Sequence, residues 1–195
     1  TISRYGADLP SIGKGVVLGV TTNCVVSHNQ ISEGSYMGIQ IGRNVSSGLT
    51  AGNNIMECNH LHDISLILHD SGVLYATGKQ TGSVYRYNLV HGVHAGPVIY
   101  PDDYAEGITY EKNLIYDFYW GMLTRGVSAT IRNNVFASMR EEGYAYVYWV
   151  ARTGFPITNN IFYHTPVNSF CFVMSMTGDV VLNQNLYYNA AGGGT

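Results

Sequence analysis

The stretch Ile131-Arg132-Asn133-Asn134-Val135-Phe136 decides the fold, because the same phrase recurs along the whole chain. Each copy has an apolar residue, two variable residues, an asparagine and then apolar residues. The seven copies carry their asparagine at Asn29, Asn59, Asn88, Asn113, Asn134, Asn160 and Asn185. These asparagines are 30, 29, 25, 21, 26 and 25 residues apart, so one structural unit is repeated seven times.

Within each copy, polar and apolar residues alternate with period two, which predicts a strand with one buried face. The residue three before the asparagine is apolar or aromatic in every copy, and the residue two before it is polar. The residue two after the asparagine forms a second column that we expect to face inward. Asparagine tolerates left-handed backbone and bonds to nearby backbone, so it suits the bend between two strands. Stacked from coil to coil, the asparagines would form an amide ladder.

The repeat length and the absence of helical patterning predict an all-β fold, a right-handed parallel β-helix of about seven coils. A leucine-rich repeat would need LxxLxL patterning, and a propeller blade about 40 residues. We expect residues 1–195 to form a single domain that belongs to a longer chain. Residues 1–22 and 190–195 fit the repeat poorly, so we expect irregular ends or caps there.

Composition excludes several classes of protein. The 195 residues carry a net charge of −3, and only 12% are charged, whereas 46% are hydrophobic. This argues against disorder and against a cationic nucleic-acid binder. No run of about 18 apolar residues exists, so the sequence predicts no membrane span.

A second strand after each asparagine strand carries a possible tyrosine ladder. We expect one column to point inward and the next to point outward. The inward column is Ile39, Leu74, Ile99, Leu123 and Val147, and the outward column is Gln40, Tyr75, Tyr100, Thr124 and Tyr148. Exposed tyrosines would suit the binding of an extended sugar chain. Alternatively, longer loops bury them as a satellite core.

Carboxylates near this strand are candidates for acid-base chemistry. Asp70 begins the phrase Asp-Ser-Gly, Asp102 and Asp103 follow Ile-Tyr-Pro, and Arg125 follows the next strand. Glycoside hydrolysis needs two carboxyl groups, one protonated and one ionised. The structural alternative is that these aspartates only cap turns. If Leu74 stacks on Ile99, a straight strand would hold Asp70 and Asp102 too far apart for a glycosidase pair.

A resemblance adds to this interpretation over roughly residues 23–140. The phrases that carry it are Asn53-Asn54-Ile55-Met56-Glu57-Cys58-Asn59-His60-Leu61-His62-Asp63-Ile64, Asp70-Ser71-Gly72-Val73-Leu74-Tyr75, Gly82-Ser83-Val84-Tyr85-Arg86-Tyr87-Asn88-Leu89-Val90-His91, Ile99-Tyr100-Pro101-Asp102-Asp103 and Arg125-Gly126-Val127-Ser128-Ala129-Thr130-Ile131-Arg132-Asn133-Asn134-Val135-Phe136. They resemble bacterial parallel β-helix proteins, among them glycoside hydrolases of the fucosidase/xylanase type. Enzymes of this type are normally much longer.

The resemblance implies a secreted or cell-surface protein that acts on a polysaccharide or oligosaccharide and needs no cofactor. It nominates Asp70 and Asp102, with Asp103, as catalytic residues. The expected substrate-binding residues are His69, Tyr75, Tyr100, Arg125, Tyr148 and Trp149. A local alternative pairs Asp102 or Asp103 with Glu106.

Three other hypotheses remain open. Exposed solenoid ends could associate end to end, as in a structural filament or surface-layer unit, or the chain could bind carbohydrate without cleaving it. A polysaccharide lyase would use Arg125 beside Asp102 and Asp103. The motif His60-Leu61-His62 and His91 suggest a metal site, but a solvated histidine pair is favoured, and no metal is expected.

Overall fold

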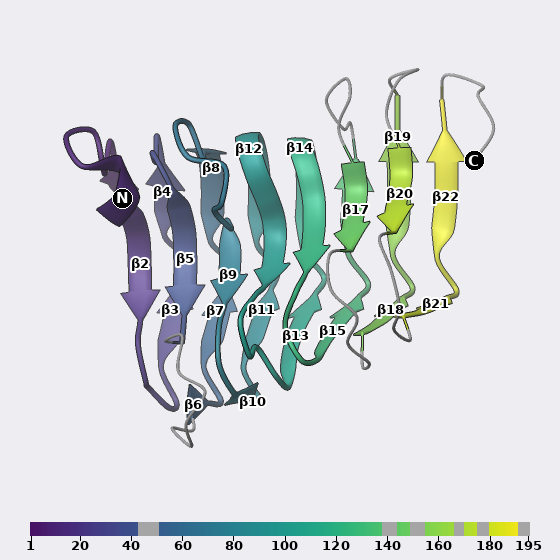
Figure 1. The fold of residues 1–195 in the computed structure, drawn as a ribbon, viewed down its shortest axis with the longest axis horizontal. Coiled ribbons are helices and arrows are strands. Elements are labelled where there is room, and N and C mark those ends of the chain that lie inside the picture. Colours follow the sequence, from purple (N-terminus) through teal and green to yellow (C-terminus); the bar gives the residue numbers. More distant parts are fainter. Residues whose placement is uncertain (43–50, 138–143, 149–154, 166–169, 175–179, 191–195) are drawn as a thin grey trace.

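The chain forms a parallel β-solenoid whose strands wind around three faces, two of which belong to one 13-stranded sheet and the third to a 7-stranded sheet (Figure 1). The computed structural model describes all residues except 43–50, 138–143, 149–154, 166–169, 175–179 and 191–195, and only the backbone of β17 (Tyr144–Tyr148) and β20 (Phe170–Met174). In this described part, η1 (Pro10–Ile12) is the only helix, and no helix is long and apolar enough to cross a membrane.

Two faces of the solenoid are joined into one sheet by two long strands that run across both. We call the first face sheet I; it consists of β1 (Ile2–Ser3), β4 (Gln30–Ser32), β8 (His60–Ile64), the first halves of β12 (Leu89–Pro101) and β14 (Leu114–Thr124), β16 (Val135–Ala137), β19 (Ile161–His164) and β22 (Leu186–Asn189). The second face, sheet II, consists of β2 (Lys14–Leu18), β5 (Met37–Ile41), β9 (Leu74–Ala76), the second halves of β12 and β14, β17 and β20.

The third face, sheet III, precedes each asparagine. It consists of β3 (Val25–Ser27), β7 (Ile55–Glu57), β11 (Val84–Arg86), β13 (Ile108–Glu111), β15 (Ala129–Arg132), β18 (Phe155–Thr158) and β21 (Val180–Asn183). A short pair, β6 (Ala51–Gly52) and β10 (Gln80–Thr81), lies beside it. All pairings are parallel. The chain makes about six turns, slightly fewer than the seven coils expected, and the predicted fold class is confirmed.

The predicted amide ladder is present between sheets III and I. The backbone N–H and the side-chain Nδ2 of Asn88 both donate to Oδ1 of Asn113, at 3.0 Å each. Nδ2 of Asn113 also donates to the carbonyl of Tyr85, one coil earlier, at 3.1 Å. The same pattern runs from Asn29 to Asn185. Asn88 and Asn113 are buried, so the backbone groups at the bend cannot form hydrogen bonds with water. The ladder amides supply these hydrogen bonds instead.

The left-handed residue of the bend is the one before the ladder asparagine, which differs from the expectation that asparagine itself takes this conformation. At the seven bends the residues in this position have φ between 54° and 57°: His28, Cys58, Tyr87, Lys112, Asn133, Asn159 and Gln184. The asparagine is therefore selected for its amide hydrogen bonds and not for its backbone. This explains why the preceding position varies so widely in sequence.

The two predicted inward columns form the core. In the column after the asparagine, Ile31, Leu61, Val90 and Ile115 are all fully buried. In the column before it, Tyr85 and Tyr110 stack with ring centroids 5.2 Å apart. At the far end of this column Leu182 is 40% exposed.

In sheet II the predicted register fails by one residue after β12. Ile99 pairs with Leu74, as expected, but its partner on the other side is Met122 and not Leu123. Leu123 therefore lies beside Tyr100 on the outer side, where it joins a second cluster of buried side chains. The cause is a register shift between Val93 and Pro97, which the sequence pattern does not reveal.

Candidate functional site

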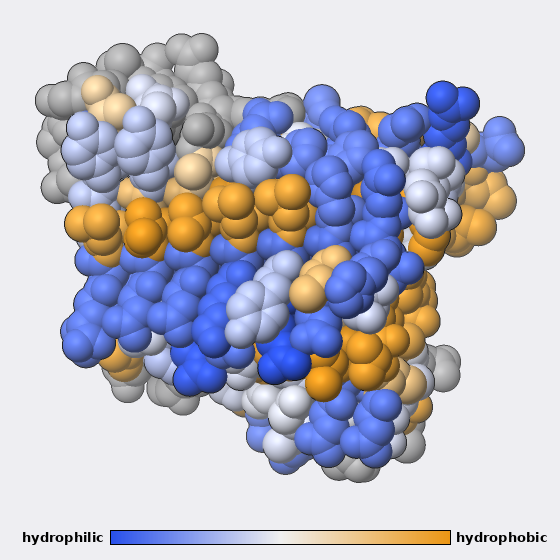
Figure 2. Space-filling model, turned by 180° about the vertical axis from the view of Figure 1, so that it is seen from behind, coloured by the Kyte–Doolittle hydropathy of each residue, from blue (hydrophilic) through white to orange (hydrophobic). Residues whose placement is uncertain are grey.

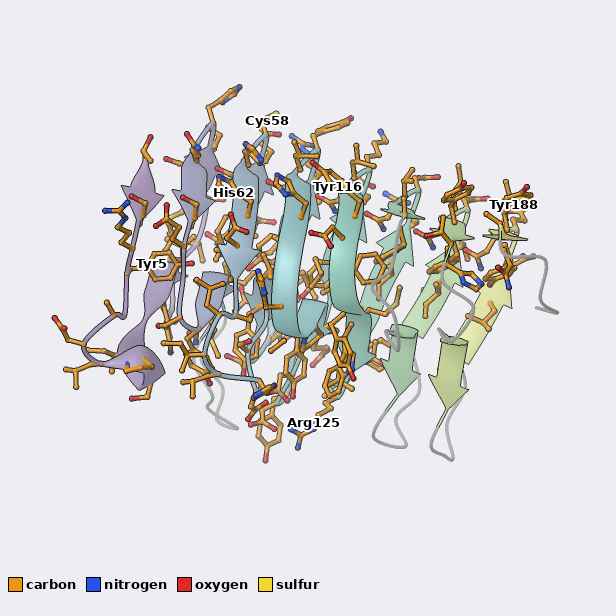
Figure 3. The ribbon with its side chains drawn as sticks, turned by 90° about the horizontal axis from the view of Figure 1, so that it is seen from above. Tyr5, Cys58, His62, Tyr116, Arg125 and Tyr188 are labelled. Atoms are coloured by element: carbon orange, nitrogen blue, oxygen red, sulfur yellow. The ribbon has the colours of Figure 1, made fainter. Side chains whose placement is uncertain are left out.

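The candidate site lies on the outer side of sheet II, where β9, β12 and β14 end. Tyr75 and Tyr100 stand side by side there, with ring centroids 5.3 Å apart and planes at 85°. The chain then leaves β12 at Pro101 into Asp102, and leaves β14 at Thr124 into Arg125. Three neighbouring coils thus bring together residues that are far apart in sequence. Figure 3 shows Arg125 projecting from this edge of the molecule.

Of the two alternatives for the tyrosine ladder, the structure has the buried one. Tyr75 is 8% exposed and Tyr100 is 1% exposed, and they pack with Met37 and Leu123. The segment that begins the Asp-Ser-Gly phrase covers them. A Cβ atom on Gly72 would lie 2.8 Å from Cδ2 of Tyr75, so only glycine lets the chain pass this close. These tyrosines therefore offer their hydroxyl groups, and not open ring faces, to the site.

Asp102 is buried and is held by the first of these hydroxyl groups. Tyr75 Oη donates to Asp102 Oδ2 at 2.7 Å. Asp102 Oδ1 is buried without a hydrogen bond, and Nη1 of Arg125 lies 3.5 Å from it. A buried carboxylate with one unsatisfied oxygen is energetically costly, and such positions are more common at functional sites than in a structural core.

Asp70 is exposed and is linked to the same cluster through the second hydroxyl group. Tyr100 Oη donates to Asp70 Oδ1 at 3.4 Å and accepts a hydrogen bond from Arg125 Nη1 at 3.2 Å. A continuous polar chain therefore runs from Asp70 through Tyr100 and Arg125 to Asp102. Although Leu74 does stack on Ile99, the site joins the two nominated carboxylates by means of tyrosine and arginine side chains.

The loop that carries Asp70 is fixed by two buried serines. Ser65 Oγ and Ser71 Oγ are 2.6 Å apart, and Ser71 Oγ also donates to the carbonyl of Leu68 at 3.1 Å. Gly96 of β12, with φ of 39°, passes beneath; a Cβ there would lie 2.4 Å from Ser71 Oγ. The aspartate is thus presented by a packed loop and not by a free one.

A cavity of about 290 Å³ opens beside this chain of polar groups. Its lining combines polar side chains with an apolar wall: His69, Asp70, Pro97, Tyr100, Trp120, Leu123 and Arg125. The volume is near the lower end of the roughly 300–1,000 Å³ typical of small-molecule sites. Asp102 does not line it, but its partner Arg125 does.

Trp120 was missed by the sequence reasoning, which chose Trp149 instead. Trp120 lies in β14, in register with Pro97 of β12, where the strands cross from sheet I to sheet II. Trp120 lies in the shortest coil, the 21 residues between Asn113 and Asn134, and no motif or insertion there marks it in the sequence. Trp149 itself lies outside the described residues.

The remaining nominated residues are not brought into the cluster. Tyr148 ends β17 in register with Thr124 and not beside Tyr100, and its side chain is outside the described part. The Asp103 backbone carbonyl accepts from Gly78 N–H, and the side chain does not line the cavity. Glu106 pairs with Lys79 at 3.3 Å, which does not favour the alternative pair with Asp102.

The environments of the ionisable groups differ in a useful way. Burial raises the pKa of Asp102 above its ordinary value, and the Asp103 charge adds to this; the Tyr75 hydrogen bond and Arg125 oppose it. Burial also raises the pKa of Tyr75 and of Tyr100, so both hydroxyl groups stay protonated at neutral pH. The hydrogen bond to Tyr100 raises the pKa of Arg125, which stays a cation.

The arrangement can therefore present one buried carboxyl group with a raised pKa, one exposed carboxyl group, a cation and two hydroxyl donors at or beside a small cavity. No family model matches this chain, and no match was found among curated proteins or solved structures.

Proposed function

We propose that this chain is a carbohydrate-active β-solenoid protein, a glycoside hydrolase whose two carboxyl groups are Asp70 and Asp102. The observation that carries the proposal is the pair of unequal carboxyl environments, linked by Tyr100 and Arg125 at the edge of the cavity. Glycoside hydrolases separate the roles of two carboxyl groups by such differences in burial. The sequence resemblance supports the same class.

The cavity suits a neutral sugar ring. Trp120, Pro97 and Leu123 provide an apolar wall for the C–H face of a sugar, and Asp70, Tyr100 and Arg125 provide hydrogen-bonding groups for its hydroxyls. Arg125 is the only lysine or arginine among the described residues that line the cavity, and Asp70 lines the same cavity, so the site has no excess of basic side chains for a strongly anionic substrate.

In the proposed reaction the raised pKa lets Asp102 hold a proton and donate it to the glycosidic oxygen as the C–O bond breaks. Asp70, which is exposed and lines the cavity, is the second carboxyl group; it, or a water molecule that it activates, forms the new bond to the anomeric carbon as the glycosidic C–O bond breaks. Arg125 stands between Asp102 and the cavity and is about one-third exposed, so its side chain must turn aside when Asp102 acts.

The lyase alternative is less well supported. A lyase would need Arg125 to remove a proton from carbon as a base. Its pKa is instead raised by the hydrogen bond to Tyr100, so the deprotonated form is less accessible than for a free arginine.

A non-catalytic carbohydrate-binding role is the second candidate, because Asp102 has no surface in the cavity. In that case Asp102 serves only to hold Arg125 in place. The protein would then bind the sugar without cleaving it, so one set of variants measured for both binding and cleavage distinguishes the two functions.

The test is reducing-end release from a panel of neutral oligosaccharides, measured together with equilibrium binding of the same sugars. We expect Asp70→Asn and Asp102→Asn each to lower the rate by about 10²-fold or more, because general acid-base catalysis contributes typically 10²–10⁴. Both variants should still bind. Trp120→Ala should weaken sugar binding. The control Asp8→Asn changes an exposed aspartate distant in sequence from the site, and it should alter neither the rate nor the binding.

Binding without release by the wild-type protein would identify the binding module. Full activity in both aspartate variants would show that the nominated pair is wrong.

A further inference from the structure

Three imidazole rings gather on the outer side of sheet I, away from the cavity. Each pair of rings among His60, His62 and His91 has its centroids 4.8 to 5.2 Å apart. Figure 3 shows His62 and Tyr116 near one side of the solenoid and Arg125 on another. The sheet register creates the cluster: His91 pairs with His62 one coil earlier, and His60 lies two residues before His62 on the same side.

Two of the three rings, those of His60 and His91, face each other through their Nε2 atoms. Nε2 of His60 lies 2.9 Å from Nε2 of His91. Two nitrogen ligands about 2.0–2.1 Å from one metal ion are about 2.9 Å apart at a right angle and about 3.3 Å apart at a tetrahedral angle. The observed separation matches the right angle, which is the geometry favoured by Cu(II).

The third ring is held in one tautomer. Nδ1 of His62 lies 2.8 Å from Asp63 Oδ2, and its Nε2 lies 3.3 Å from the amide nitrogen of Gln30. An amide nitrogen only donates, so His62 accepts at Nε2 and donates from Nδ1 to the carboxylate. The planes of the His62 and His91 rings are 7° apart, so these rings stack. On its other side, His91 stacks with Tyr116, with ring centroids 4.7 Å apart. His91 is therefore packed between two rings, which leave it only small rotations.

We propose that His60 and His91 chelate a divalent first-row transition ion of tetragonal preference, Cu(II) above Zn(II), with water at the remaining positions. A small rotation of each ring turns the two lone pairs from each other toward one ion. His62 acts as a positioning residue that stacks on His91. Among the described residues, no group of three His, Cys, Asp or Glu side chains is arranged to hold a metal, which is why the site is assigned to two protein ligands.

The alternative explanation is a simple N–H···N hydrogen bond between neutral His60 and His91. It requires no metal and predicts no selective affinity. The two explanations therefore differ in a direct binding measurement that does not depend on any enzymatic activity.

The experiment is a titration of the intact chain with Cu(II) against a competing chelator, followed by electron paramagnetic resonance, with a parallel Zn(II) titration. We expect one Cu(II) per chain, nitrogen hyperfine splitting, and weaker Zn(II) binding. His60→Ala and His91→Ala should each weaken Cu(II) binding at least about 10-fold. The matched control is His28→Asn, which removes an exposed histidine and places asparagine at a residue with φ of 57°.

Circular dichroism of each variant checks that the solenoid is retained, and Asp63→Asn provides a second, milder variant that leaves both ligands in place. Equal Cu(II) affinity in the wild type and in the His60→Ala/His91→Ala double variant would overturn the proposal. So would an equal loss in His28→Asn, or Zn(II) binding tighter than Cu(II) binding.

Discussion

The asparagine bend and the Asp70–Asp102 corner both bury polar groups, but they differ in how completely these groups are hydrogen-bonded. At the bend, the interior amides of the ladder both donate and accept along the solenoid, and one coil repeats the next. At the corner, Asp102 Oδ1 and Arg125 Nε are both buried without a hydrogen bond, and the arrangement occurs once. Repetition with full satisfaction is typical of a structural element, and a single unsatisfied cluster is typical of a functional one.

Exposed apolar side chains on sheet I show the same contrast between the regular solenoid and the corner. Leu114, Ile161 and Leu186 are 43%, 41% and 60% exposed on the outer side of sheet I. Each directly follows a ladder asparagine, and Figure 2 shows an apolar band running across this face. Regular solenoid positions thus tolerate exposed apolar side chains, whereas Asp102 and Tyr100 of the polar cluster are buried.

The largest effect on stability is expected at the ladder. Asn113→Leu removes the acceptor of two Asn88 donors and the donor to the Tyr85 carbonyl, all of them buried. Each buried group left unpaired costs about 1–3 kcal/mol, so we expect a loss of about 3 kcal/mol or more in unfolding free energy. Chemical denaturation measures it.

The control for that variant is Asn29→Leu at the first rung, which is only half-buried. Its Oδ1 receives no bond from an earlier ladder asparagine, so the loss should be clearly smaller. Equal losses at the two positions would mean that the ladder does not carry the stability assigned to it.

A medium effect is expected at the corner. Gly72→Ala places a Cβ 2.8 Å from Tyr75 Cδ2 and 2.9 Å from Tyr100 Cβ. Overpacking of this kind typically costs about 1–3 kcal/mol, and it should also displace Asp70 and weaken sugar binding. Gly19→Ala, where nothing lies within 4 Å, is the matched control and should leave both quantities unchanged. Unaltered binding in Gly72→Ala would remove the argument that this glycine positions Asp70.

The smallest effect has the opposite sign. Cys58 is exposed, precedes a ladder asparagine and has φ of 54°. Asparagine tolerates this conformation better, so Cys58→Asn should raise the unfolding free energy by about 0.5–1 kcal/mol. Thermal unfolding under reducing conditions measures the change, with Cys24→Ser as the control; a lower melting temperature would contradict it.

The sequence predicted the bend better than the corner, for a physical reason. Asn113 and its equivalents repeat a local hydrogen-bonding need at a nearly fixed spacing, so the columns are visible in the sequence. The positions of Leu123 and Trp120 depend on a register shift between Val93 and Pro97, which has no residue signature.

Asp70, Asp102, Tyr100 and Arg125 could be nominated from residue type and from the resemblance. Their contacts could not be, because Tyr100 and Arg125 bridge strands from three coils. The choice between an exposed and a buried Tyr75 stayed open in the sequence for a similar reason, since the covering loop at Gly72 is a tertiary contact.

The most direct test asks whether Asp102 serves the site and not the fold. Its folded-state pKa is raised by burial, so its contribution to stability is present at pH values below the unfolded pKa and is lost as pH rises through the folded pKa. The measurement is the unfolding free energy of the wild type and of Asp102→Asn between pH 4 and pH 8. This range starts near the pKa of an unfolded aspartate, about 3.9, and extends above it.

We predict that the variant gains on the wild type as pH rises and that it is the more stable protein at pH 8, while hydrolysis is lost. A variant that becomes steadily less stable than the wild type as pH rises would show that the Asp102 carboxylate stabilises the fold, and would contradict the account.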